Sequence, residues 1–296
     1  MKRFVIAALL AVGACSTGSS SPTTNPPAAT TSAVTTSPVT TSAVTTSPVG
    51  EGEAPPGTTA QVAAVLDGDS IAVVVGGRED ELRLVGINAP ESGECFADEA
   101  RALLGTAAGD TIVIVGDGRD QFGRILGYAY RGADNLNQWM LAAGGALATT
   151  PEHDLLPDFL AAEQESVLRG IGMWADGVCA SAAASSVSIY EVEFDAPGRD
   201  DENPNGEYAI IGNEGDPTNL TGWTLRDESS VHRYTFPDGT VLGSGEFLVI
   251  RSGCGDDSAE DLHWCAEGSV WNNDGDTAIL IDMDGIYVSR LRYFGD

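Results

Sequence analysis

The chain has 296 residues, enough for about two domains, and its apolar content of 42% is ordinary for a folded protein. Its charge is unusual, because 15 basic residues stand against 44 acidic ones and give a net charge of −29. Such a chain excludes nonspecific attachment to nucleic acid through a basic surface. Beyond the first residues, no stretch is long and apolar enough to span a bilayer as a helix.

Residues 1–14 have the features of a signal peptide, with a short basic start, MKR, and the apolar stretch FVIAALLAVGA. They run into Val12-Gly13-Ala14-Cys15, which resembles a bacterial lipobox. The resemblance implies cleavage before Cys15, lipidation of its thiol and attachment to a membrane. The alternative is ordinary signal cleavage with Cys15 incidental. We expect an exported protein, held at the outer face of the cell surface.

Residues 15–57 are predicted to form a tether. The segment 16–50 is made of Ser, Thr, Pro, Ala, Val, Gly and Asn without a charge, and the unit TSAVTTSPV occurs at 31–39 and again at 41–49. Such a composition cannot bury enough apolar surface to offset chain entropy. We interpret the segment as an extended spacer between an anchor and a folded cargo.

Residues 58–178 predict a small β-barrel with helices. Runs rich in β-branched residues, punctuated by Gly and Asp, indicate strands, and three segments have helical character. The expected strands are VAAVLDGDSIAVVV, ELRLVGI and TIVIV, and the expected helices are ADEARALLGTAA, LNQWMLAAG and LPDFLAAEQESVLRGIGMW. Pro157 suits the first turn of the third helix, and Gly170 suits its end.

Residues 187–296 predict a second domain of a different class. Short strands alternate with turn clusters about every 10 residues, and no segment has a convincing helical period. The expected strands include EYAIIGN, GWTLRD, EFLVIRSG and TAILIDMDG. This pattern favours an all-β sandwich, so the whole chain is expected to be mainly β.

Three motifs of the first domain come in one order. Asp67-Gly68-Asp69-Ser70 precedes a strand, Arg-x4-Asn-x-Pro-Glu spans 83–91, and Asp-x-Phe-Gly-Arg spans 120–124. Alone, Asp-Gly-Asp is most simply a turn. Together, the motifs resemble the staphylococcal nuclease (thermonuclease) family over about residues 60–177. The resemblance implies an OB-type five-stranded barrel with three helices.

The resemblance also implies a Ca²⁺-dependent phosphodiesterase that cleaves DNA and RNA. By position, Asp67, Asp69 and Asn88 would hold the metal. Glu91 would activate or orient the attacking water, and Arg83 and Arg124 would bind the phosphate; the three would form the catalytic set. Guanidinium groups can form forked hydrogen bonds to the phosphate oxygens, on which negative charge builds in the transition state. A divalent ion can neutralise charge and position the attacking water. The alternative for the charged residues is an ordinary strand-end salt bridge.

The sequence departs from the family pattern in three places. Asn88 stands where Asp is usual, so one ligand brings no negative charge. Phe122 stands where Tyr is frequent, and GALATTPEHDLL lacks the tyrosines that family members often carry for base stacking. The domain 58–178 also has seven arginines and 19 acidic residues, a net charge of −12.

The second domain resembles the lamin-tail family over about residues 187–296. The shared elements are Gly-Trp-x-Leu-x-Asp at 222–227, Phe-Pro-x-Gly at 236–239, a Gly-Glu-Phe strand and Trp-Asn-Asn-x-Gly-Asp at 271–276. The resemblance implies an immunoglobulin-like β-sandwich, with no indication of its partner. We expect Asp-Gly-Asp at 274–276 to be a turn into a buried strand, and Trp223 and Trp271 to be core residues.

Four cysteines remain besides Cys15, and four allow three connectivities. An exported protein permits disulfides. The domain boundaries favour Cys95–Cys179 and Cys254–Cys265.

The leading hypothesis is a surface-anchored, monomeric Ca²⁺-dependent nuclease acting on extracellular DNA or RNA. The first alternative is a nucleic-acid-binding or adhesion module with little or no turnover. Asn88 and the missing tyrosines favour this alternative. In the second alternative, the sandwich domain carries the main function by docking a partner, and the barrel contributes no activity of its own.

Overall fold

The computed structural model describes residues 53–150, 153–179, 186–199, 202–229 and 231–295. These residues belong to one compact unit, Thr46–Asp296. The predicted signal peptide, the lipidation site Cys15 and the tether up to residue 52 lie outside the described residues. Within the described ranges, no helix has the length and apolarity needed to cross a membrane.

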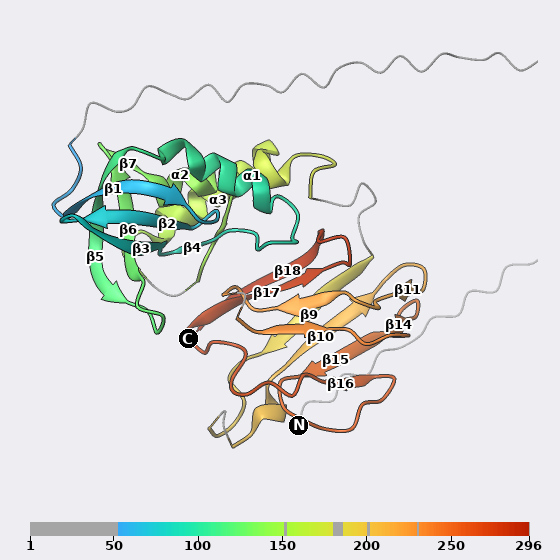
Figure 1. Ribbon diagram of the computed structural model, residues 1–296. Helices are drawn as coiled ribbons and strands as arrows, with labels where there is room; N and C mark the ends of the chain where they lie inside the picture. The colour runs from blue at the N-terminus through green and yellow to red at the C-terminus, as the bar shows by residue number, and fades with distance from the viewer. Residues whose placement is uncertain (1–52, 151–152, 180–185, 200–201, 230, 296) are drawn as a thin grey trace, which may run out of the picture. The chain divides into compact units, whose positions relative to one another are not determined.

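The first half of this unit is a closed barrel of five strands (Figure 1). The strands are β1 (Thr58–Val65), β2 (Ser70–Val75), β3 (Arg78–Leu84), β5 (Thr111–Arg119) and β6 (Ile125–Arg131). They pair in the order β3-β2-β1-β5-β6, and a parallel pairing of β3 with β6 closes the barrel. The predicted OB-type barrel is thereby confirmed. Two short additions are β7 (Asp134–Asn135) beside β6, and β4 (Ile87–Asn88) paired with β8 (Leu147–Ala148).

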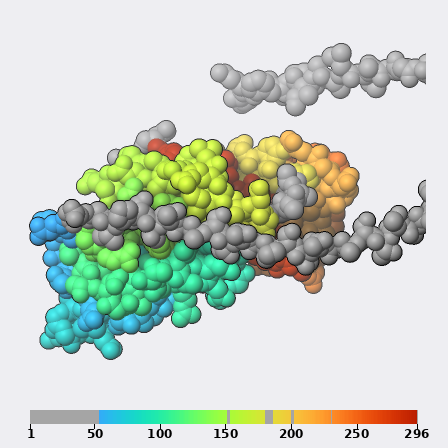
Figure 2. Space-filling view, turned by 90° about the horizontal axis from the view of Figure 1, so that it is seen from above, coloured from blue at the N-terminus to red at the C-terminus, as the bar shows by residue number. Residues whose placement is uncertain are grey.

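Three helices pack against the barrel, as expected (Figure 1). They are α1 (Ala97–Leu104), α2 (Leu136–Ala142) and α3 (Leu156–Arg169), with 3₁₀ turns at Gly105–Ala107 and Gly172–Trp174. Their buried residues Leu104, Met140 and Phe159 join the core formed by the strands. The side chain of Asn135 caps α2 by accepting the amide of Gln138. Residues coloured yellow-green, which include α3, form part of the surface seen in Figure 2.

The second half is a β-sandwich of two four-stranded sheets, which agrees with the predicted immunoglobulin-like class. A two-stranded pair, β11 (Thr218–Asn219) with β14 (Val241–Leu242), and a 3₁₀ turn at Pro204–Gly206 complete it. The first sheet has the strand order β16 (Asp261–His263), β15 (Phe247–Arg251), β10 (Tyr208–Asn213) and β9 (Val187–Glu193). The second sheet has the strand order β13 (Arg233–Thr235), β12 (Thr224–Arg226), β17 (Gly275–Ile281) and β18 (Tyr287–Phe294). Trp223 and Trp271 lie in the sandwich core, as expected.

Both expected disulfides are formed. Cys95–Cys179 ties the segment before α1 to the end of the barrel domain, and Cys254–Cys265 closes a loop of the sandwich. Constraining such loops contributes about 2–4 kcal/mol in typical cases.

The barrel domain and the sandwich share a small apolar cluster. Leu147 of β8 is buried with Ile279 and Ile281 of β17, and Trp174 and Tyr287 pack against them. The second Asp-Gly-Asp feeds β17, all of whose residues are buried. Asp274 lies in the turn before β17, and Gly275 and Asp276 begin the strand, so the triplet leads from a turn into a buried strand, as expected.

Candidate active site

The first Asp-Gly-Asp forms a tight turn between β1 and β2. The amide of Asp69 donates to Oδ1 of Asp67 over 2.9 Å, which orders the turn from within. Gly68 is required here, because an added Cβ would come within 2.5 Å of the Ala89 Cβ and 2.9 Å of the Ala100 Cβ. The turn is thus packed directly against the segment that follows β4 and against α1.

The two carboxylates of this turn have different surroundings. Asp67 is exposed, whereas Asp69 is only 5% exposed. Asp69 accepts hydrogen bonds from the Ser70 hydroxyl at 3.0 Å and the Ala89 amide at 2.7 Å, and it pairs with Arg83 Nη1 at 3.0 Å. Burial raises the pKa of Asp69 to about 7, although Arg83 and the Ala89 amide oppose the rise. A cation placed here would stabilise the ionised form.

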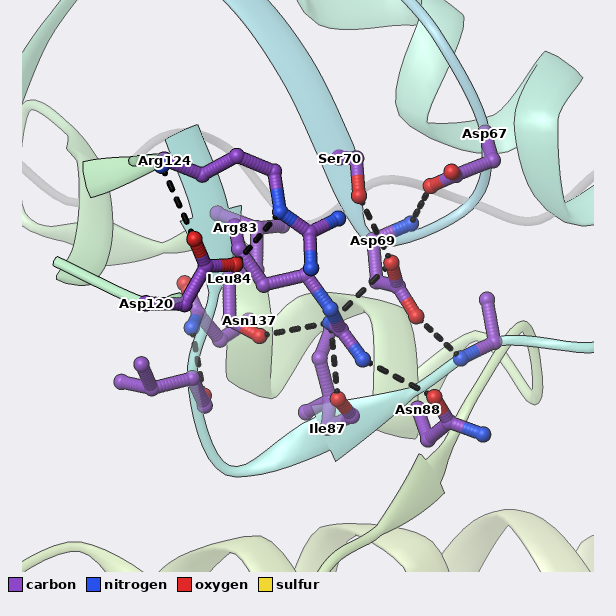
Figure 3. A network of polar contacts seen from close by, with 12 residues as sticks. Asp67, Asp69, Ser70, Arg83, Leu84, Ile87, Asn88, Asp120, Arg124 and Asn137 are labelled. Atoms are coloured by element: carbon purple, nitrogen blue, oxygen red, sulfur yellow. Dashed lines mark hydrogen bonds and ion pairs between the residues drawn. The ribbon is translucent and has the colours of Figure 1, made fainter. Parts of the chain in front are cut away.

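Arg83 joins two of the predicted metal ligands. Its Nη1 donates to the carbonyls of Leu84 and Ile87 at 2.9 and 3.0 Å, and its Nη2 donates to Oδ1 of Asn88 at 2.8 Å (Figure 3). With the ion pair to Asp69, this guanidinium fixes the loop between β3 and β4 around the Asp-Gly-Asp turn. Much of its hydrogen-bonding capacity is therefore used within the protein.

Arg124 is held by a turn of its own. Oδ1 of Asp120 accepts the backbone amides of Phe122 and Arg124, both at 2.9 Å, and its Oδ2 accepts Nε of Arg124 at 2.6 Å. A longer ion pair of 3.7 Å reaches Glu81. Burial by itself would lower the pKa of Arg124, but Asp120 and Glu81 raise it above the usual value. Figure 3 shows the guanidinium pointing toward Asp69 and Arg83.

Glu91 stands apart from the other predicted site residues. It is exposed, and among the described residues no hydrogen bond or ion pair joins its carboxylate to the other five. Its backbone is fixed by Glu94, since the Glu91 amide donates to Oε2 of Glu94 at 3.0 Å and the Glu94 amide donates to the Glu91 carbonyl at 2.8 Å. The structure brings together Asp67, Asp69, Arg83, Asn88 and Arg124, with Glu91 on the adjoining loop.

Sequence reasoning missed two residues that shape this site. Asp120 is one, although the motif Asp-x-Phe-Gly-Arg contains a signal for it, because an Asp before a Gly turn commonly accepts amides two to four residues on. Glu94 is the other, and no local pattern singles it out. The arginines that pair with its carboxylate lie more than 130 residues away in sequence.

The donors at the turn fit a hard divalent cation. Asp67 and Asp69 supply carboxylate oxygens and Asn88 an amide oxygen, and such ligands suit Ca²⁺ or Mg²⁺ rather than soft metals. In the described part of the chain, no group of three or more His, Cys, Asp or Glu could hold a metal. A bound cation would therefore need ligands besides carboxylates, such as the Asn88 amide oxygen, backbone carbonyls or water. A hollow of about 300 Å³, lined in part by Asp67, Pro90 and Ser92, leaves space beside the turn.

Comparisons with known proteins match both halves of the chain. A family described as "Staphylococcal nuclease homologue" matches residues 81–176, and one described as "Lamin Tail Domain" matches residues 180–295. An "uncharacterized endonuclease" of Escherichia coli is 34% identical over 121 residues, covering 39% of this chain and 76% of the relative. A "micrococcal nuclease" of Shigella flexneri is 31% identical over 130 residues, covering 39% of this chain and 73% of the relative.

Proposed function

Because the chain belongs to the staphylococcal nuclease homologues and carries a lamin tail domain, we propose that it is a Ca²⁺-dependent phosphodiesterase that cleaves DNA or RNA. One observation carries the proposal. Asp69 and Asn88 are linked by one guanidinium, Arg83, while a second guanidinium, Arg124, points toward the same place. Oxygen donors for a cation and forked donors for a phosphate thus lie side by side.

Each residue has a defined task in this proposal. Asp67, Asp69 and Asn88 hold the cation, which when bound neutralises phosphate charge and lowers the pKa of a water. Arg124 is the main phosphate ligand, since Arg83 is largely engaged by backbone carbonyls.

Glu91 accepts a proton from the attacking water or orients that water. Its exposed carboxylate lies on a loop adjoining the turn, where a bound substrate can meet it.

The charge of the domain shapes the conditions of activity. With a net charge of −12 over residues 58–178, the domain repels a polyanion outside the site. Physiological salt screens this repulsion to a range of about 8 Å. We expect cleavage to need divalent cation in the millimolar range or substantial salt.

The place of action is part of the proposal. The basic start, the apolar stretch and the lipobox-like ending at Cys15 support export and a lipid anchor. The two disulfides within the described residues suit an oxidising compartment. We therefore propose that the enzyme acts as a monomer on nucleic acid outside the cell.

A nuclease assay tests the proposal. Plasmid DNA and single-stranded RNA are incubated with the wild type, Glu91→Gln and Arg124→Ala across a Ca²⁺ titration and in EDTA. We expect Glu91→Gln to lower kcat by about 10²–10⁴-fold and Arg124→Ala to lower kcat/KM by about 10²–10³-fold. Matched controls are Glu165→Gln and Arg169→Ala, which remove the same groups from an exposed pair on α3.

Two results would contradict the proposal. Full cleavage in EDTA at low ionic strength would refute the metal assignment. If the wild type and both site variants were equally inert yet still bound DNA, the protein would be a binding module, as the neutral Asn88 would then explain.

A further inference from the structure

Glu94, in the loop that carries Glu91, is held by the lamin tail domain. Its side chain is 5% exposed. Arg226 donates through Nε to Oε1 at 2.9 Å and through Nη2 to Oε2 at 3.1 Å. Arg233 donates to Oε1 and the Tyr287 hydroxyl to Oε2, each at 2.6 Å. Three side chains of the sandwich therefore converge on one carboxylate of the barrel domain.

The same carboxylate also holds the backbone of Glu91. Oε2 of Glu94 accepts the Glu91 amide at 3.0 Å, and the Glu94 amide returns a 2.8 Å hydrogen bond to the Glu91 carbonyl. The turn from Glu91 to Glu94 is thus closed by one backbone hydrogen bond and one side-chain hydrogen bond. Only one residue, Glu94, separates the backbone of Glu91 from the arginines of the lamin tail domain.

The rest of the loop is attached to the same domain. The Cys95 amide donates to the Gly285 carbonyl at 2.9 Å, and Cys95 is bonded to Cys179. Gly285 has a φ of +79°, and an added Cβ would come within 2.5 Å of the Gly93 carbonyl oxygen. Only glycine permits this approach of the two backbones.

The charges at this contact are matched. Arg226 is fully buried, which is costly for a guanidinium without a partner. Burial by itself would raise the pKa of Glu94, but Arg226, with Tyr287 and Arg233, lowers it below the ordinary value. Glu94 is therefore ionised at neutral pH, and its bonds to the lamin tail domain are charge-assisted.

We propose that the lamin tail domain positions the active-site loop of the nuclease domain, with Glu94, Arg226, Arg233 and Tyr287 as positioning residues for Glu91. This inference rests on the proposed function of Glu91. The carboxylate of Glu91 is exposed and is not anchored by other site residues, so its position depends on its backbone. Contacts from the second domain to Glu94 therefore add to the restraints on that backbone from within the barrel domain.

A second contact between the domains provides a control. Glu163 of α3 is 2% exposed and accepts Arg290 at 2.6 Å, and it pairs with Arg292 at 2.8 Å. Arg290 and Arg233 are alike, since their side chains are 30% and 34% exposed and each donates a 2.6 Å bond to a buried carboxylate of the barrel domain. Of these two arginines, only Arg233 contacts the loop of Glu91.

The test compares Arg233→Gln with Arg290→Gln in the full chain with its disulfides intact. Misplacing a catalytic group by about 1 Å can cost on the order of 10²-fold in rate. We expect Arg233→Gln to lower kcat about 10- to 100-fold with KM within about twofold, because the phosphate-binding arginines are held within the barrel domain, Arg83 on β3 and Arg124 by Asp120 just before β6. Arg233→Lys should recover part of the loss, and Arg290→Gln should keep the wild-type kcat.

Glu94→Gln is a second variant that approaches the contact from the other domain. Its amide group must face either Arg226 Nε and Arg233, or Tyr287 and the Glu91 amide, so one set of donors loses its acceptor. We expect a fall in kcat at least as large as that of Arg233→Gln.

Hydrogen exchange of the loop gives a readout that is independent of activity. In the wild type, the amides of Glu91 and Cys95 should exchange slowly, and Arg233→Gln should speed both, whereas Arg290→Gln should not. Equal effects of the two arginine variants on kcat, or on exchange, would overturn the inference. A wild-type protein that does not cleave nucleic acid would refute the proposed function, while exchange would still decide whether the lamin tail domain holds the loop.

Discussion

Replacing Glu228 with glutamine should change how the stability of the lamin tail domain depends on pH. Glu228 is 4% exposed and is surrounded by neutral donors. It accepts the Thr150 amide at 3.0 Å, the Thr150 hydroxyl at 2.9 Å and the Thr277 hydroxyl at 3.2 Å. Burial, and then the nearby Asp276, raise its pKa from 4.5 to about 7.

The sign and size of the effect follow from linkage. A carboxyl group whose pKa is higher in the folded state favours folding while it is protonated. Its contribution is complete below pH 4.5 and is lost as the pH rises through about 7. Since one pKa unit corresponds to about 1.4 kcal/mol, the loss for Glu228 is on the order of 3 kcal/mol between pH 4.5 and pH 8.

Glutamine imitates the protonated side chain. With its oxygen in the place of Oε2, it keeps the bonds from both hydroxyls and one from the Thr150 amide. Its amide group takes the place of Oε1, which accepts only that same backbone amide. We therefore expect Glu228→Gln to match the wild type at pH 5 and to exceed it by about 1–3 kcal/mol at pH 8.

Urea unfolding at pH 5 and pH 8 measures this difference, followed by the fluorescence of the buried Trp223 and Trp271. Glu267→Gln is the control, because it removes one carboxylate from an exposed position of the same domain. A difference between Glu228→Gln and the wild type that is the same at both pH values would refute the reasoning. So would an equal pH effect of Glu267→Gln.

Two further substitutions test the geometry of the active site. Asp120→Ala removes the carboxylate that orients Arg124, so we expect the KM for a defined oligonucleotide to rise about tenfold. Steady-state kinetics measures this change, and an unchanged KM would exclude the orienting role of Asp120. Arg83→Lys keeps the charge but loses the fork between Asp69 and Asn88, so we expect half-maximal activity to need about tenfold more Ca²⁺ in a titration. An unchanged Ca²⁺ requirement would show that Arg83 does not order the ligands.

The elements of the fold were predictable where local signals agree. Pro157 in the first turn of α3 and Gly170 at its end, with a φ of +60°, are both local signals, and the helix ends where they predict. The barrel strands follow from β-branched runs between Gly and Asp. The two disulfides followed from domain boundaries, because each pair lies within one folded domain or at its end.

The surroundings of the loop of Glu91 could not be predicted in the same way. Glu94 reads as one more surface acid in an acidic chain, and its buried state exists only because Arg226 and Arg233 of another domain cover it. Glu163 on α3 is a similar case, since a Glu in a helix is ordinarily exposed. Arg290 and Arg292 neutralise it from 127 and 129 positions further along the chain. Such pairs are fixed by domain packing, on which short sequence patterns carry no information.

The two Asp-Gly-Asp triplets show why partners, rather than pattern, decide the role of a carboxylate. Asp69 and Asp276 are both buried, and burial raises the pKa of both, to about 7 and about 6. Asp276 is fully enclosed, and its carboxylate is stabilised only by backbone and amide donors, beside the acidic Glu228. Asp69 neighbours the exposed Asp67 and a hollow open to solvent, so a metal ion can reach it. The same triplet therefore leads into a fully buried strand in one domain, and in the other it lies beside open solvent, where we propose that it holds a cation.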